Sequence, residues 1–194
     1  MRDITNNEMM FVLGVFKSPR TQYNASSLAK LLGITRMGAL KIAKKLEKER
    51  IISSEKLGQA RFYRINQDNN YARQYLSFLL KREAEQAHPY VKSWIAEIRK
   101  IKSADAAMLF GSVLRKHKEA RDIDVMLITV QNRFDKLKKD IEEIDKINTK
   151  KIHPMYQTRE DFARNIKNGD KPLLDAVKGT CVFGEDLIIE LMQA

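Results

Sequence analysis

The sequence predicts an α+β protein built from two different domains. Its first 70 residues show three helical patterns followed by two strand patterns, whereas short apolar strands alternate with helices from residue 104 onward. The charge is equally uneven: residues 1–103 carry 20 Lys and Arg against 9 Asp and Glu, and residues 104–194 carry 16 against 16. A length of 194 residues suits two small domains. We expect them at 1–70 and 104–194, with 71–103 as a helical linker and dimer contact.

The N-terminal elements follow from apolar spacing and from residues that start or stop helices. Ser18-Pro19 ends the first helix, and Gly33 ends the second, for which the stretch Asn24-Ala25-Ser26-Ser27 offers N-cap residues. Thr35 is placed to cap the third helix, and a turn at 57–59 separates two strands. The expected order is helix, helix, helix and hairpin, at residues 8–17, 28–32, 36–50, 51–56 and 60–65.

The segment 71–102 has a helical pattern with a possible break at His88-Pro89. An apolar stripe runs along its second half at spacings of three and four, formed by Val91, Trp94, Ile95 and Ile98. Such a stripe can pack against its own domain, join two domains or form a dimer seam. We favour the linker and dimer contact, although packing within one domain accounts for the pattern equally well.

Beyond Ser103 the chain alternates between short strands and helices. The expected strands lie at 106–110, 122–130, 150–156 and 179–183, and the expected helices at 134–147, 160–166 and 185–192. This alternation predicts a small mixed sheet covered by helices.

Composition excludes several classes of protein. No run of eighteen apolar residues exists, so no membrane span is expected, and the N-terminus lacks the features of a secretory signal. The single Cys181 cannot form an internal disulfide, which fits a cytoplasmic protein. His88, His117 and His153 do not have the spacing of a zinc site.

The first domain has the elements of a DNA-binding motif. A tight turn at 33–35 between two helices makes a helix-turn-helix, and the hairpin adds a wing. Ala39, Leu46 and either Ile42 or Ala43 share the inner face of the third helix, so the other face can offer donors to phosphates and guanine edges. The candidate DNA-binding residues are Thr35, Arg36, Lys41, Lys44, Lys45, Lys48, Lys56, Gln59 and Arg61.

Three stretches carry a family likeness: Ser27–Thr35 (SLAKLLGIT), Leu46–Ile52 (LEKERII) and Ala60–Ile65 (ARFYRI). In this order and spacing they resemble winged helix-turn-helix transcriptional regulators. The resemblance implies double-stranded DNA as a partner and a homodimer. Exposed lysines are often only a solvated surface, and winged helices also bind proteins, but the confinement of the charge to this half favours DNA.

The second domain contains a pattern suited to phosphates and metal ions. An apolar strand ends in Gly111-Ser112, where glycine allows close approach to a phosphate and serine offers its hydroxyl and amide to the same anion. Asp122 and Asp124 stand two apart at the start of the next strand, so both point to one side and can bind Mg²⁺. Together these residues would hold a metal–triphosphate.

In this combination the domain resembles the DNA polymerase β-type nucleotidyltransferase superfamily in its minimal form. The resemblance implies that Gly111 and Ser112 bind the triphosphate of a nucleoside triphosphate, and that Asp122 and Asp124 are the catalytic residues that bind Mg²⁺. Active members place a third carboxylate on a later strand, whereas the matching strand at 150–156 holds no acid.

Two substitutes for the third carboxylate can be considered in the sequence. His153 lies in the matching strand and could act as a base, although a lone histidine is more often structural. Glu160 and Asp161 follow at a helix start, where capping is their expected role. The stretch Tyr156–Phe162 resembles one found in regulator-fused members of the superfamily.

Three functional hypotheses follow. The first is a DNA-binding transcriptional regulator whose second domain binds Mg-nucleotide or a partner. The second is an active nucleotidyltransferase that moves NMP from an NTP to a protein, nucleic acid or small-molecule hydroxyl. In the third, the second domain is a pseudoenzyme that contacts an all-helical protein partner.

Overall fold

The computed structural model describes residues 3–192, which divide into two compact units on either side of the Leu79–Leu80 bond. Each unit is described by itself. Helices and two separate sheets confirm the mixed α+β class. Helix α4 (Asn70–Glu85) contains the boundary, so its residues up to Leu79 belong to the first unit and those from Leu80 to the second.

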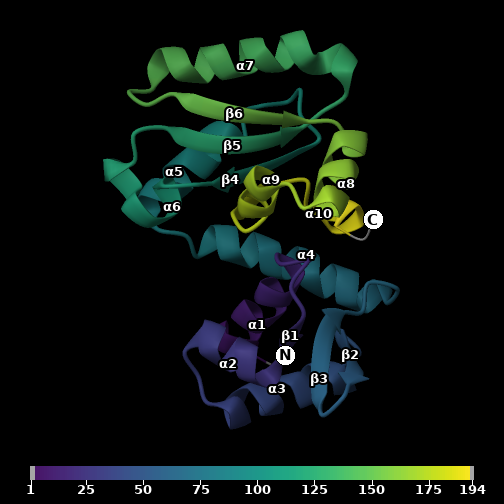
Figure 1. Cartoon of the computed structure of the whole chain (residues 1–194). Helices are drawn as coiled ribbons and strands as arrows, with labels where there is room; N and C mark the ends of the chain where they lie inside the picture. The colour runs from purple at the N-terminus through teal and green to yellow at the C-terminus, as the bar shows by residue number, and fades with distance from the viewer. Residues whose placement is uncertain (1–2, 193–194) are drawn as a thin grey trace. The chain divides into compact units, whose positions relative to one another are not determined.

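The first unit follows the expected order of helices and hairpin (Figure 1). Its elements are α1 (Asn6–Phe16), β1 (Tyr23–Asn24), α2 (Ala25–Leu32), α3 (Arg36–Lys48), β2 (Ile52–Leu57) and β3 (Ala60–Ile65). Gly33 ends α2 in the left-handed conformation with φ of 64°, and Thr35 caps α3 by accepting a hydrogen bond from the Gly38 N–H. These two residues therefore set the tight turn between α2 and α3.

Strand β1 is a feature that the sequence did not predict. Its two residues pair with β3, so that the sheet order is β1-β3-β2. Asn24 also caps α2, because its side chain accepts hydrogen bonds from the Ser26 and Ser27 N–H groups at 3.0 and 2.9 Å. A two-residue strand shows no alternation of apolar and polar side chains, which is why it escapes sequence analysis.

The second unit has a mixed sheet with the order β6-β5-β4-β7 (Figure 1). Its strands are β4 (Ala106–Phe110), β5 (Ile123–Ile128), β6 (Ile152–Gln157) and β7 (Thr180–Phe183). Strands β5 and β6 are parallel, whereas β4 is antiparallel to both β5 and β7. The remaining elements are α5 (Pro89–Ile98), α6 (Val113–Lys116), η1 (His117–Glu119), η2 (Gln131–Arg133), α7 (Phe134–Ile147), α8 (Arg159–Asn168), α9 (Lys171–Ala176) and α10 (Glu185–Leu191).

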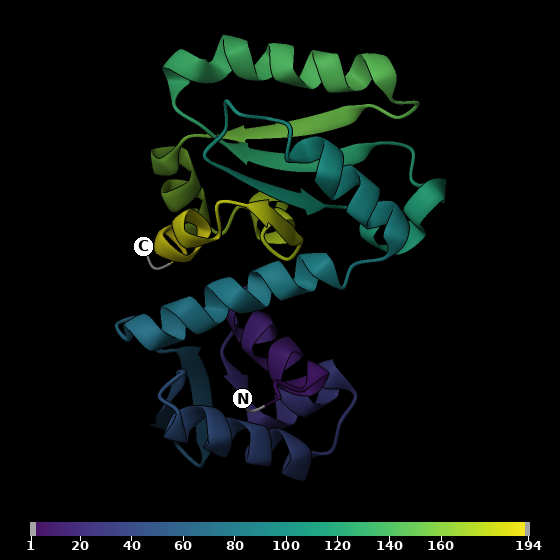
Figure 2. The same ribbon diagram turned by 180° about the vertical axis from the view of Figure 1, so that it is seen from behind.

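The two faces of this sheet are covered by different helices. On one face Leu109 and Val125 pack in a single core with α5 and α7, and Figure 2 shows α5 crossing this face. On the other side α8 contacts β6, while α9 and α10 contact β4. Alternate strand residues therefore point toward different layers, and Asp124 points to the face opposite Val125.

The preferred role for the apolar stripe of residues 91–98 as a linker and dimer seam is wrong. All four stripe residues of α5 are buried in the core of the second unit, from 0% exposed for Ile98 to 4% for Trp94. The stripe thus packs against its own domain, which was the alternative interpretation. A homodimer requires a different surface.

Short elements account for the other differences from the expected pattern. Helices α6 and α9 were not predicted, because four and six residues are too few to show helical periodicity. Asp122 precedes β5 instead of lying in it. No helix within residues 3–192 is both long and apolar enough to cross a membrane.

Candidate functional site

A basic stripe runs along the outer side of α3. Lys41, Lys44 and Lys48 are exposed and lie at spacings of three and four, which places them on one face of the helix. The opposite face packs inward through Ala39, Ala43 and Leu46, so the inward residue at the ambiguous third position is Ala43. The stripe is therefore a free cationic surface held on a rigid element.

The beginning of α3 adds further exposed groups. Thr35 and Arg36 are exposed, as the sequence predicted for residues at the start of this helix. Met37 is also 63% exposed and lies four residues before Lys41, on the same face. Met37 was not among the predicted contacts, although its spacing from Lys41 and Lys44 indicates this position.

Lys45 does not belong to the basic stripe. Its ammonium pairs with the buried carboxylate of Glu8 on α1, and the two side chains are only 18% and 6% exposed. The other oxygen of Glu8 accepts a hydrogen bond from the Thr5 N–H at 3.0 Å. Lys45 therefore fastens α3 to the start of α1, and its assignment as a DNA-binding residue is corrected because its charge is already used within the fold.

Replacing Lys45 with alanine is expected to lower the free energy of unfolding by about 1 to 3 kcal/mol, because Glu8 would be left as a buried, unpaired carboxylate. Lys44→Ala is the matched control, since Lys44 is the exposed neighbour and its loss should change the free energy by less than about 0.5 kcal/mol. Urea unfolding followed by circular dichroism would measure both. Equal effects of the two substitutions would contradict the structural role of Lys45.

The hairpin presents a second basic group at its tip. Lys56 and Arg61 lie directly opposite each other across β2 and β3, and both are exposed together with Gln59 in the turn. Like charges at directly opposite positions destabilise a sheet unless an anion lies between them. Arg64, which the sequence analysis did not select, is also exposed, and its Nε donates to Ser53 Oγ at 3.2 Å.

The base of the hairpin joins the core of the first unit. Tyr63 is 5% exposed, and its ring lies 5.7 Å from that of Phe11. Burial raises the pKa of the Tyr63 phenol, and the nearby charge of Glu47 raises it further. The hairpin is thus anchored at its base while its cationic tip is free.

In the second unit Gly111 lies against the carboxylate of Asp124. Gly111 has φ of 78°, and a Cβ atom built on it would lie 2.0 Å from Asp124 Oδ2. We expected this glycine to make room for a phosphate. In the structure it makes room for the carboxylate of Asp124, which occupies the position that a side chain at residue 111 would take.

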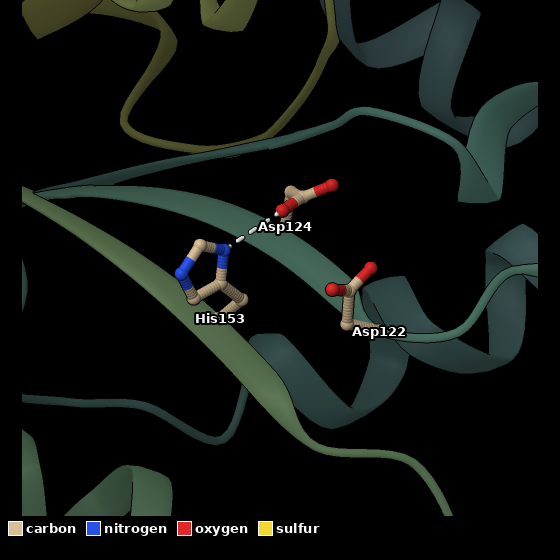
Figure 3. A group of neighbouring side chains, drawn as sticks. All are labelled: Asp122, Asp124 and His153. Carbon is tan, nitrogen blue, oxygen red and sulfur yellow. Dashed lines mark hydrogen bonds and ion pairs between the residues drawn. The ribbon is translucent and has the colours of Figure 1, made fainter.

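Asp122, Asp124 and His153 form one cluster, with ligand atoms that all lie within 4.8 Å of one another. Figure 3 shows His153 on β6 and the two aspartates from β5 and the residue before it. His153 Nδ1 lies 3.1 Å from Asp124 Oδ1. The parallel register of β5 and β6 brings this about, because it sets Asp124 opposite His153. Asp122 and His153 are exposed, and Asp124 is partly buried.

The histidine occupies the place where the resemblance leads one to expect a third carboxylate. The other substitutes are excluded by position, since Glu160 and Asp161 begin α8 beyond the far end of β6. Hydrogen bonds from Thr158 and then Arg164 lower the pKa of Asp161. Asp161 lies in the first turn of α8, whose N-cap is Thr158, and the Asp161 N–H donates to the Thr158 hydroxyl. Sequence analysis undervalued His153 because the strand register was unknown.

A pocket of about 490 Å³ adjoins Gly111. It is lined in part by Phe110, Gly111, Leu114, Arg115, Asp175 and Lys178. Ser112 lies next to it, immediately before α6, and its hydroxyl makes no capping hydrogen bond there. Lys178 donates to Asp175 at 2.9 Å, so its charge is partly balanced within the lining. The guanidinium of Arg115 and the hydroxyl of Ser112 are groups that bind phosphate oxygens.

The two carboxylates are oxygen ligands of the kind that Mg²⁺ prefers. The imidazole of His153 is a ligand for transition ions instead. Asp122 and Asp124 therefore fit the Mg²⁺ that the resemblance implies, whereas the complete set of three donors fits it less well.

No protein-family model matches the sequence, and no curated protein matches it. One matching solved structure is the zinc-dependent MarR-family transcriptional regulator AdcR in its Zn(II)-bound state. The match has 16% sequence identity and a TM-score of 0.26, and it covers 51% of this chain and 73% of that chain. A likeness this distant supports no conclusion about function.

Proposed function

We propose that this protein is a DNA-binding transcriptional regulator that contacts double-stranded DNA through α3 and the hairpin of β2 and β3. The observation that carries the proposal is the exposed stripe of Lys41, Lys44 and Lys48, on the helix that follows the tight turn at Gly33. Met37 on the same face offers an apolar contact for a thymine methyl group. Lys56 and Arg61 at the hairpin tip would meet neighbouring phosphates.

The net charge of +11 supports a polyanionic partner, and its distribution supports this part of the chain as the contact. Residues 1–79 carry 14 Lys and Arg against 6 Asp and Glu. Lysine and arginine side chains that pair with DNA phosphates release the counterions bound there, which gives affinity for any duplex. Contacts to base edges then select the operator.

The test is duplex binding of the full chain, measured by fluorescence anisotropy at several salt concentrations. The affinity is expected to fall steeply between about 50 and 200 mM salt, because each lysine or arginine that pairs with a phosphate releases a counterion, and added salt opposes that release. Binding that is absent at the lowest salt concentration, or independent of salt, would overturn the proposal.

A second candidate function, metal–nucleotide binding by the second unit, is supported by one specific arrangement. Gly111 lines a pocket together with Arg115 and Lys178, and Ser112 follows it in the sequence. The carboxylate of Asp124 lies against Gly111 and clusters with that of Asp122. We propose that a nucleoside triphosphate binds there together with a divalent cation. The nucleotide is either a signal for the regulator or the substrate of a reaction that transfers NMP to a hydroxyl group and releases pyrophosphate.

Incubation with a divalent cation and each labelled NTP, alone and with cell extract, separates these roles. Wild-type protein is expected to retain nucleotide, and the Asp122→Ala/Asp124→Ala variant is expected to lose at least about tenfold in affinity. Label transferred only by the wild type would favour the nucleotidyltransferase. Retention without transfer would favour the sensor, and no retention would overturn nucleotide binding in favour of a protein-contact role.

A further inference from the structure

The three donors at the start of β5 and β6 indicate which ion this protein binds. We infer that Asp122, Asp124 and His153 form a site for a first-row transition ion, represented by Mn²⁺ or Co²⁺, which the site prefers to Mg²⁺. The inference shares its carboxylates with the proposed metal–nucleotide site, but the ion needs no nucleotide in order to bind.

Ligand chemistry is the first argument. Carboxylate oxygens accept Mg²⁺, Mn²⁺ and heavier ions, whereas imidazole nitrogen is a poor partner for Mg²⁺ and a good one for transition ions. A site with two carboxylates and one histidine is therefore expected to bind transition ions more tightly than Mg²⁺, because of its imidazole nitrogen. Three protein ligands also leave coordination positions open for water or phosphate oxygens.

Geometry is the second argument. Donor atoms that share an ion at about 2.1 Å lie about 3 to 3.5 Å apart. His153 Nδ1 and Asp124 Oδ1 already have this spacing, at 3.1 Å, and the whole set lies within 4.8 Å. The Asp124 side chain is 21% exposed, while His153 is 74% exposed and can adjust.

Unbalanced charge is the third argument. Within residues 3–192 neither Asp122 nor Asp124 has an ion pair with a lysine or arginine, although this chain carries 36 of these residues. Among the described residues, Arg121, directly before Asp122, and Lys151, two residues before His153, make no such pair, and Lys151 donates to the backbone oxygen of Asp145 instead. Two neighbouring carboxylates without a cation repel each other, and a divalent ion between them removes that cost.

Proton NMR of the histidine imidazoles tests the inference directly, because the chain has three histidines. Mn²⁺ alone, added to the full chain below one equivalent, is expected to broaden the His153 resonances first. His153→Gln identifies those resonances by their loss. His88 and His117 are internal controls, since their rings stack on each other at 3.8 Å and neither belongs to the cluster. A sharp His153 signal, or equal broadening of all three histidines, would overturn the inference.

Exchange of the distinguishing ligand gives the second readout. His153→Asp supplies a third carboxylate at an exposed position, and it is expected to shift the ratio of Co²⁺ to Mg²⁺ affinity toward Mg²⁺ by about tenfold or more. His117→Ala is the matched control and should leave the ratio unchanged. An unchanged ratio in His153→Asp would show that the imidazole is no ligand. Mn²⁺ binding without nucleotide retention would overturn only the nucleotide proposal.

Discussion

Duplex affinity is expected to fall by about a hundredfold at 0.1 M salt when Lys41, Lys44 and Lys48 are all replaced by glutamine. Each lysine–phosphate pair contributes about 0.9 to the slope of log affinity against log salt, so the triple replacement should reduce the slope by close to three units. The three side chains are exposed on α3, and their removal leaves the buried packing of Ala39, Ala43 and Leu46 intact. Anisotropy over a salt series measures both quantities.

A matched control is available on α7. Lys136, Lys139 and Lys146 are exposed on one helix of the second unit, so their replacement by glutamine removes the same charge from another place. This control is expected to lose much less than tenfold, because α7 is not among the elements proposed to contact phosphates, and charges without a direct phosphate contact are screened at this ionic strength. Equal losses from both triple variants would mean that net charge and not the α3 face drives binding.

Gly111→Ala is expected to destabilise the second unit by about 2 to 5 kcal/mol. A positive φ costs an alanine about 1 to 2 kcal/mol, and the new methyl group would overlap the carboxylate of Asp124. Overpacking of this kind adds about 1 to 3 kcal/mol. Urea unfolding followed by the fluorescence of Trp94, the single tryptophan of the chain and part of the core of the second unit, reports the change.

A double-mutant cycle separates the two costs of Gly111→Ala. In an Asp124→Ala background the overlap with the carboxylate is gone, so Gly111→Ala should cost only the backbone strain of about 1 to 2 kcal/mol. The difference between the two backgrounds measures how closely Gly111 confines Asp124. Identical costs in both backgrounds would contradict the overlap between a side chain at residue 111 and the carboxylate of Asp124.

Local signals predicted most of the fold. Gly33 and Thr35 marked the turn before α3, and α7 begins and ends where its apolar spacing indicated. Strand β1 and helix α9 were too short for any periodic pattern to appear. The stripe of α5 was recognised, but the surface that buries it could not be, because amphipathicity shows that a face is covered without showing what covers it.

The candidate sites divide in the same way. The two-residue spacing of Asp122 and Asp124 predicted carboxylates close together, and the structure brings them together. The place of His153 depends on the register of two parallel strands joined through α7, which is a long-range property. Lys45 looked like the other lysines of α3, and only its partner Glu8, 37 residues away in the sequence, distinguishes it.

The two-residue strand β1 has a consequence for how the protein would respond to the groove width of a bound duplex. Asn24 pairs with Phe62 of the hairpin and at the same time caps α2, so the hairpin and the helix-turn-helix share one residue. A wing tied to α2 in this way is restricted in how far it can move when the groove width changes. DNA would have to adjust instead, and the energy of that adjustment depends on base-step stiffness. We therefore expect discrimination between duplexes that differ only in bases the protein does not touch.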